Sequence, residues 1–404
     1  MERWRRDLYI LWICSFIVQM GFSLIMPFLP LYLEELGVQG PAVEMWAGVI
    51  FSANFVVMAI VSPIWGSLSD RVGRKPMMLR SAFGMAAVVA LMGLAQTPWH
   101  MLGLRLLQGL AAGFIPAATA YMASVVPRER AGHALGLLGT GNVAGSILGP
   151  LVGGLLAKGM GYRPIFFVTA LSCLVAGAIV LLLVRERFTP VERTERGGFA
   201  AGLAAVRQYP VVMAMTVVLF MNMFSILTAE PVLARYLRML EAPEDWVALL
   251  SGLVFSVTGI ATIIVAPQVG KLSDRIGSRR LLAIALGGAS VMYLLQGFAT
   301  AVWQMVALRF VLGLFTGGLM PAANGLIART VPKEMQGRVF GLTSSAIFIG
   351  NTVGPLVGGV VASTFGIRAV FPVTGALLLL DLIWVLAAVR EERQPAPARA
   401  TGHL

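Results

Sequence analysis

Long apolar segments separated by short polar ones run along almost the whole chain of 404 residues. Twelve of them are long enough to cross about 30 Å of hydrocarbon as a helix, and they lie at about 8–33, 46–65, 77–96, 99–126, 133–157, 164–184, 211–233, 246–269, 281–299, 303–328, 339–363 and 369–389. A spanning segment must satisfy its own backbone hydrogen bonds, and runs this long suit helices better than the short alternating strands of a barrel. The pattern therefore predicts an all-α membrane protein with twelve transmembrane helices.

Composition and charge support this prediction. Hydrophobic residues make up 58% of the chain and charged residues 12%, and the mean hydropathy is +0.83, which is more apolar surface than a soluble fold can bury. The net charge of +12 does not indicate a nucleic-acid partner, because 24 of the 31 Lys and Arg fall on one side of the predicted membrane. By the positive-inside rule that side is cytoplasmic, and both termini lie on it.

The second half of the sequence repeats the first. GSLSDRVGRKP at 66–76 returns as GKLSDRIGSRR at 270–280, and GPLVGG occurs at both 149–154 and 354–359. Each half has six predicted helices, an even number, so both halves enter from the same side as parallel repeats, with binding expected at their interface. We expect an N-terminal half at 1–187, a cytoplasmic linker at 188–209 and a C-terminal half at 210–404.

Three motifs carry a family resemblance. The pattern G-x-x-x-D-R-x-G-R-[KR] follows the second predicted helix closely and the eighth more loosely, the fourth helix carries R-x-x-Q-G at 105–109, and the fifth carries G-x-x-x-G-P-x-x-G-G at 145–154. Together they resemble the major facilitator superfamily over essentially the whole chain. The fifth-helix motif is similar to that of the twelve-helix drug:proton antiporters, which include bacterial multidrug efflux transporters.

The resemblance implies a function. It implies a secondary active transporter of the plasma (inner) membrane that exports lipophilic, drug-like compounds in exchange for protons by alternating access, and so a role in antibiotic resistance. The expected partners are a small-molecule substrate, protons and the lipid bilayer, and the expected state is a monomer without a cofactor. A proton-coupled metabolite or sugar carrier and a lipid or glycolipid translocase of the same fold remain alternatives.

The repeated charged motif is predicted to be a conformational latch. In the family, the acid at the end of the second helix is thought to meet the N-terminus of a helix from the other half, holding the cytoplasmic side closed. The alternative is a solvated basic turn. The residues concerned are Gly66, Asp70, Arg71, Gly73 and Arg74, with Asp274 and Arg275 in the second copy.

Two arginines lie inside predicted helices, where a charge is costly unless it faces a wet cavity. Arg105, with Gln108 three residues later, and its repeat mate Arg309 are therefore candidates for proton coupling or cavity electrostatics. The alternative for each is an arginine that extends its charged end to the membrane surface.

Two carboxylates also fall inside predicted helices, Glu230 and Asp381. Asp381, near mid-depth, is either a proton carrier or a neutral packing acid. Glu230 is either a contact for a substrate cation or a boundary residue paired with Arg235. The first predicted helix lacks the acid that many drug:proton antiporters carry there, so the coupling acid stays open.

The remaining candidates concern packing and substrate. In the antiporter motif, Gly145, Gly149, Pro150, Gly153 and Gly154 are implied to seal the interface between the halves, although close helix packing alone also explains them. On the helices that line the cavity in the family, the resemblance implies polar and aromatic substrate-binding candidates: Gln19, Phe22, Asn222 and Asn324. The three His are scattered and the two Cys isolated, so we predict neither a metal site nor an enzymatic centre.

Overall fold

A computed structural model describes residues 3–186 and 209–389, and the regular elements within them are all helices. Twelve candidate membrane spans lie in this part of the chain, which confirms the predicted number and, within several residues, the predicted positions. The predicted linker at 188–209 lies outside the described residues, apart from Tyr209, which precedes α10.

The N-terminal half runs from α1 to α8. Its elements are α1 (Arg3–Ile25), η1 (Met26–Phe28), α2 (Leu29–Glu35), α3 (Ala42–Val72), α4 (Arg74–Gly93), α5 (Pro98–Ala111), α6 (Phe114–Val125), η2 (Arg128–Arg130), α7 (Ala131–Met160) and α8 (Arg163–Leu183). The C-terminal half contains α10 (Pro210–Ala229), η3 (Glu230–Val232), α11 (Leu233–Met239), α12 (Glu244–Ile276), α13 (Ser278–Gln296), α14 (Val302–Thr316), α15 (Leu319–Thr330), α16 (Lys333–Phe365) and α17 (Ile367–Ala388).

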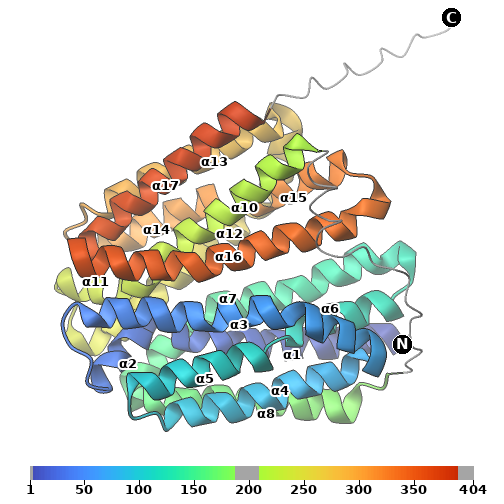
Figure 1. Cartoon of the computed structure of the whole chain (residues 1–404), viewed down its shortest axis with the longest axis horizontal. Coiled ribbons are helices and arrows are strands. Elements are labelled where there is room, and N and C mark those ends of the chain that lie inside the picture. Colours follow the sequence, from blue (N-terminus) through green and yellow to red (C-terminus); the bar gives the residue numbers. More distant parts are fainter. Residues whose placement is uncertain (1–2, 187–208, 390–404) are drawn as a thin grey trace, which may run out of the picture.

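The long helices of both halves run roughly along the long axis of the molecule, with the N-terminal half on one side and the C-terminal half on the other (Figure 1). The end where α1 begins and α17 ends is called the terminal end below, and the end that carries α2 and α11 the far end. Between the halves, α3 packs against α16 and α7 against α12. These two helix pairs are where the halves meet.

The repeat extends to buried contacts. The Tyr32 hydroxyl donates to the Met92 carbonyl oxygen at 3.2 Å, and its repeat mate Tyr236 donates to the carbonyl oxygen of Gln296 at 2.7 Å. All four residues are buried. In each half this bond ties the far end of the first span to the far end of the third.

The first and fourth spans of each half are interrupted, where the sequence predicts continuous helices. Pro27 and Pro231 lie in the short 3-10 turns η1 and η3, where the missing N–H of proline breaks the α-helical ladder. Between α5 and α6, Gly113 has φ 125°, a backbone conformation that favours glycine. The corresponding break between α14 and α15 falls at 317–318.

The charged motif, which the sequence places after the second predicted helix at 46–65, is itself helical. α3 continues through Asp70 and Arg71 to Val72, and α4 begins at Arg74, so Gly73 alone separates the two helices. Its φ of 101° makes the sharp reversal possible without a longer connection. A basic residue in the last turn, here Arg71, also favours extension of the helix because it complements the helix dipole.

Candidate functional site

A cavity of about 610 Å³ lies between α3, α4, α5 and α6, nearer the terminal end than the far end. One residue of α16 also lies in its wall. Its lining is mainly apolar and includes Met58, Trp65, Met77 and Phe348. Charged side chains join the wall toward the terminal end, among them Arg80. Its volume lies within the range of ordinary small-molecule sites.

Arg80 fixes the break in the fourth span beside this cavity. Its guanidinium donates to the carbonyl oxygens of Leu110 at 2.9 Å and Ala112 at 2.7 Å, which lie at the C-terminus of α5. The same group lies 3.8 Å from the centre of the Trp65 ring, and the Trp65 indole N–H donates to Leu110 at 3.0 Å. Arg80 and Trp65 therefore satisfy backbone groups that the helix break leaves open.

The residues of the predicted latch also lie beside the cavity. Gly66, Asp70 and Arg74 line it, and the Asp70 carboxylate pairs with Arg74 of its own half at 3.3 Å. A methyl group on Gly66 would meet no atom within 4 Å. In this conformer, Gly66 therefore faces open space rather than a closely packed helix.

The other predicted latch residues occupy the same end. Arg71 is exposed at the end of α3, and Arg275 is exposed in the last turn of α12. The side chain of Asp274 lies outside what the structure describes. At the start of α4, the Glu186 carboxylate accepts the backbone N–H groups of Arg74 at 2.9 Å and Lys75 at 2.8 Å, and so caps that helix.

At the far end, by contrast, the halves are in close contact. A methyl group on Gly154 would lie 2.6 Å from the Ala248 carbonyl oxygen of α12, and one on Gly252 would lie 2.1 Å from that of Pro150. The second helix pair repeats this crossing, because Gly48 would meet the Pro355 carbonyl oxygen at 2.3 Å. Only glycine allows backbones to approach so closely.

Matching hydrogen bonds accompany the crossings. The Ser52 hydroxyl of α3 donates to the Thr352 carbonyl of α16, and the Ser256 hydroxyl of α12 donates to the Ile147 carbonyl of α7, both at 2.5 Å. Ser52 and Ser256 are repeat mates. The closure of the far end is thus close to two-fold symmetric.

The predicted antiporter motif divides its contacts between two partners. Methyl groups on Gly145, Gly149 and Gly153 would lie 2.6, 2.7 and 2.2 Å from backbone oxygens of α1, inside the N-terminal half. Gly154 and the Pro150 carbonyl instead face α12 of the other half. The motif therefore packs its own half and also forms part of the crossing between halves.

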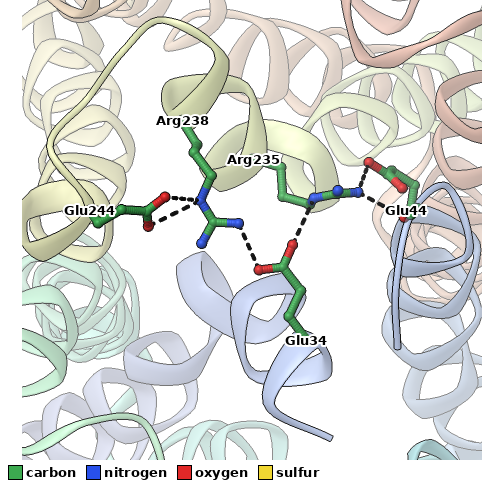
Figure 2. A network of polar contacts seen from close by, with 6 residues as sticks. Glu34, Glu44, Arg235, Arg238 and Glu244 are labelled. Carbon is green, nitrogen blue, oxygen red and sulfur yellow. Dashed lines mark hydrogen bonds and ion pairs between the residues drawn. The ribbon is translucent and has the colours of Figure 1, made fainter. Parts of the chain in front are cut away.

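An ion-pair network adds to the closure of the far end (Figure 2). Arg235 of α11 pairs with Glu34 of α2 at 3.0 Å and also with Glu44 of α3. Arg238 pairs with Glu34 at 2.7 Å and with Glu244 of its own half at 2.9 Å. Two arginines of one half are thus held by two carboxylates of the other.

Sequence reasoning misses this network because charges at helix ends are ordinary. One signal points to it. Glu34 and Arg238 are repeat mates 204 positions apart. Mates of a parallel repeat can meet across the pseudo-two-fold axis. Two like charges would repel there, whereas the opposite charges of Glu34 and Arg238 attract.

Inside the N-terminal half, Arg105 and Gln108 form a buried pair. Both are under 4% exposed, and an Arg105 guanidinium N–H donates to the Gln108 side-chain oxygen at 3.0 Å. The guanidinium also lies 6.0 Å from the centre of the Phe51 ring. The arginine therefore points into protein and does not extend to the membrane surface.

Inside the C-terminal half, Arg309 has a different environment. It is 2% exposed and lies 5.7 Å from the centre of the buried Tyr293 ring. The partly buried Glu230 interacts electrostatically with Arg309, and Tyr293 with both. Glu230 therefore lies within electrostatic range of Arg309 and Tyr293, although no hydrogen bond or ion pair joins Glu230 to Arg309 in the described part of the chain.

Comparison with known proteins agrees with this architecture. The family model for the Major Facilitator Superfamily matches residues 11–240 and again 212–403. The chain belongs to this superfamily. Among curated proteins, the Multidrug resistance protein MdtG of Citrobacter koseri is 42% identical over 397 residues, covering 98% of each chain. MdtG of Salmonella typhimurium is 42% identical over 391 residues, covering 96% of this chain and 97% of that one.

Solved structures share the fold at low sequence identity. The nucleoside transporter NupG superposes with a TM-score of 0.78 at 13% identity, covering 95% of this chain and 98% of that one. A bacterial homologue of the human lysosomal transporter Spinster, in an inward-facing and occupied conformation, superposes with a TM-score of 0.78 at 15% identity, covering 96% and 97%. Members of the superfamily are transporters, so this chain is a multi-pass membrane transporter and not an enzyme.

The second candidate acid, Asp381, lies on a different helix from Glu230. Asp381 is 1% exposed on α17, and neither of its carboxylate oxygens has a hydrogen-bond partner among the described residues. α17 packs against α10, α13 and α16 of its own half. Burial without a partner suits a neutral, packed acid.

The four predicted substrate-binding residues do not line the 610 Å³ cavity. Gln19 donates to the Ser23 hydroxyl within α1 at 3.4 Å, and Phe22 packs against the core. Asn222 is buried in α10, and its side-chain oxygen has no partner among the described residues, while Asn324 is partly buried in α15. The structure does not bring the four together at this cavity.

Proposed function

We propose that this transporter exports lipophilic, drug-like compounds across the plasma (inner) membrane in exchange for protons, with its terminal end in the cytoplasm. The name of the curated relatives, multidrug resistance protein, supports the substrate class. The excess of Lys and Arg at the terminal end supports the orientation.

The contrast between the two ends is the observation that carries the proposal. The far end is closed by the glycine crossings and ion pairs, while the cavity at the terminal end leaves Gly66 facing open space. Alternating access requires such a conformer, with one end closed and the other open. In the proposed orientation, it is the conformer that takes up substrate from the cytoplasmic side.

The cavity lining supports a lipophilic substrate. Met58 and Met77 are flexible and polarizable, and Trp65 and Phe348 offer aromatic surface. Such a wall adapts to molecules of different shape, which is a property of promiscuous binding surfaces. A metabolite or sugar carrier would be expected to have a wall denser in polar groups.

Glu230 is the carboxylate that we assign to proton coupling. When ionised, it balances the buried charge of Arg309. When it takes up a proton, Arg309 loses that balance, so the electrostatic energy depends on the protonation state. A free-energy difference of this kind is what shifts a transporter between two conformers.

The test is efflux of a fluorescent lipophilic compound from proteoliposomes under an imposed pH gradient. Wild type, Glu230→Gln and Asp381→Asn would be compared at equal reconstitution. We expect gradient-driven efflux by wild type and Asp381→Asn and its loss in Glu230→Gln. Loss in Asp381→Asn alone would move the coupling role to Asp381. No gradient-driven movement by wild type would refute the proposed exchange.

A further inference from the structure

We propose that Glu44 is a second proton-binding site of this transporter, at which protons from the far side release Arg235 and allow the far end to open. The inference concerns regulation of the closure described above and rests on the proposed alternating access. It does not depend on Glu230 or on the identity of the substrate.

Glu44 combines burial with incomplete pairing. It is 3% exposed, in the first turn of α3. One carboxylate oxygen pairs with Arg235, and the other has no hydrogen-bond partner among the described residues. A buried carboxylate with a single ionic partner pays a desolvation cost while charged, which protonation removes.

Arg235 is shared between two carboxylates of the other half. Besides Glu44, it pairs with Glu34 at 3.0 Å and donates to the Gly40 carbonyl oxygen at 3.2 Å. Glu34 is also held by Arg238. Because Glu34 has another arginine and more contact with water, its pairing is less sensitive to a proton than that of Glu44.

No further charge compensates Glu44 from the helix packed against it. α16 crosses α3 here, and its sequence from Val339 to Phe365 contains no charged residue. η3 also packs against α3 and carries Glu230, but the charged groups that act on Glu44 are Arg235 on α11 and Glu34 on α2. Arg238 and Glu244 follow one step further away (Figure 2).

The position of Glu44 connects its charge to the closure. A methyl group on Gly359 of α16 would lie 2.6 Å from the Glu44 backbone oxygen, and Gly48, one helical turn later, crosses α16 as well. The repeat mate of Glu44 is the uncharged Ala248, whose backbone oxygen makes the matching contact with Gly154. The same crossing thus carries an ionic clamp on one side only.

The direction of the effect follows from the charges. While Glu44 is ionised, its pair with Arg235 holds the far end closed. As the pH falls, protonation of Glu44 removes one of the two carboxylates that hold Arg235, and the open form gains population. Acid outside would therefore favour release on the far side.

The experiment measures the distance between the halves at the far end by spin-label spectroscopy in lipid nanodiscs, without substrate or gradient. The labels are placed on cysteines at the exposed repeat mates Gln39 and Pro243, after Cys14→Ala and Cys173→Ala. Distances are recorded from about pH 8 to about pH 5, a range that extends toward the ordinary carboxyl titration.

For wild type we expect the fraction of the long-distance form to rise by about tenfold as the pH falls across this range. This change lies between the stabilisation that an exposed ion pair gives and the loss that follows when a buried pair is broken. Glu44→Gln and Arg235→Gln should give the long form already at high pH, without pH dependence. Glu244→Gln, at the exposed rim of the same network, should behave as wild type.

A distance in wild type that does not change with pH, or a Glu44→Gln variant with an unchanged titration, would overturn the inference. Because this measurement needs no transport, its failure is separate from that of the proposed exchange. A wild type that shows the distance change but no gradient-driven efflux would keep the clamp and refute only the proton-driven export.

Discussion

In the N-terminal half, the buried Arg105 donates a hydrogen bond to a neutral partner, Gln108, whereas its repeat mate Arg309 in the C-terminal half lies within electrostatic range of the acidic Glu230. Leu312 stands where Gln108 would be repeated. The duplicated scaffold thus keeps both arginines and changes their surroundings. Arg105 with Gln108 has one total charge. Arg309 with Glu230 has two, because a proton can neutralise the acid.

The difference extends over several neighbouring positions. Three polar residues of the C-terminal half have apolar repeat mates in the N-terminal half. Met26, Val89 and Met92 stand where the C-terminal half has Glu230, Tyr293 and Gln296. Tyr293 and Gln296 are buried, and the Tyr293 hydroxyl has no hydrogen-bond partner among the described residues. Buried polar groups without partners are costly, so their presence inside a membrane protein points to a function. In the proposed exchange, proton coupling thus belongs to the C-terminal half, while the 610 Å³ cavity is lined mainly by the N-terminal half.

Replacing the two arginines separately should show the largest difference. Arg309→Met removes the positive charge that acts on Glu230, so we expect gradient-driven efflux to be lost. Arg105→Met leaves only a neutral amide, so we expect a smaller loss. Initial rates of gradient-driven efflux in proteoliposomes measure both, with reconstituted amounts matched.

A double variant separates charge from packing. Glu230→Met with Arg309→Met removes both charges and gives position 230 the residue that its mate Met26 has. Its thermal unfolding temperature should recover toward wild type while efflux stays lost. Equal instability of the single and double variants would show that the attraction between Glu230 and Arg309 is unimportant.

Where the halves are alike, matching substitutions should have matching effects. Gly48→Ala and Gly252→Ala each bring a methyl group within 2.3 Å or less of a carbonyl oxygen of the other half. Such overpacking costs about 1–3 kcal/mol, and it falls on the closed form of the far end. Spin-label distances at the far end should lengthen by similar amounts in both variants.

Gly66→Ala is the control for this pair, because its methyl group meets open space in this conformer. The far-end distance should therefore stay as in wild type. Unequal effects of Gly48→Ala and Gly252→Ala would indicate that the two crossings are not equivalent in the closed state.

The sequence predicts the twelve spans and the repeat because both depend on local composition and on self-similarity. It does not predict the helix breaks at 112–113 and 317–318, since glycine is frequent in many of these helices. The sequence also does not predict the ion pairs of Arg235, because pairing between the halves depends on how two separate surfaces meet. Arg235 is anticipated only as one alternative partner of Glu230, whereas it pairs with Glu34 and Glu44.

Gln108→Leu converts one position of the N-terminal half to its C-terminal counterpart and should have a moderate effect. It removes the hydrogen bond to Arg105 and leaves a buried guanidinium N–H unpaired, which costs about 1–3 kcal/mol. Thermal unfolding in detergent should report this loss. An unchanged unfolding temperature would mean that another group, such as water, replaces the glutamine.

The smallest effect is expected at the rim of the far-end network. Glu244 pairs with Arg238 inside one half, and its side chain is 68% exposed, so the pair contributes at most about 1 kcal/mol and is weakened by salt. Glu34 links Arg238 and Arg235 to the other half with a side chain only 26% exposed. Efflux and far-end distance should therefore respond to Glu34→Gln and remain almost unchanged in Glu244→Gln. Equal responses would mean that total charge at the far end, and not the links between the halves, decides how firmly it closes.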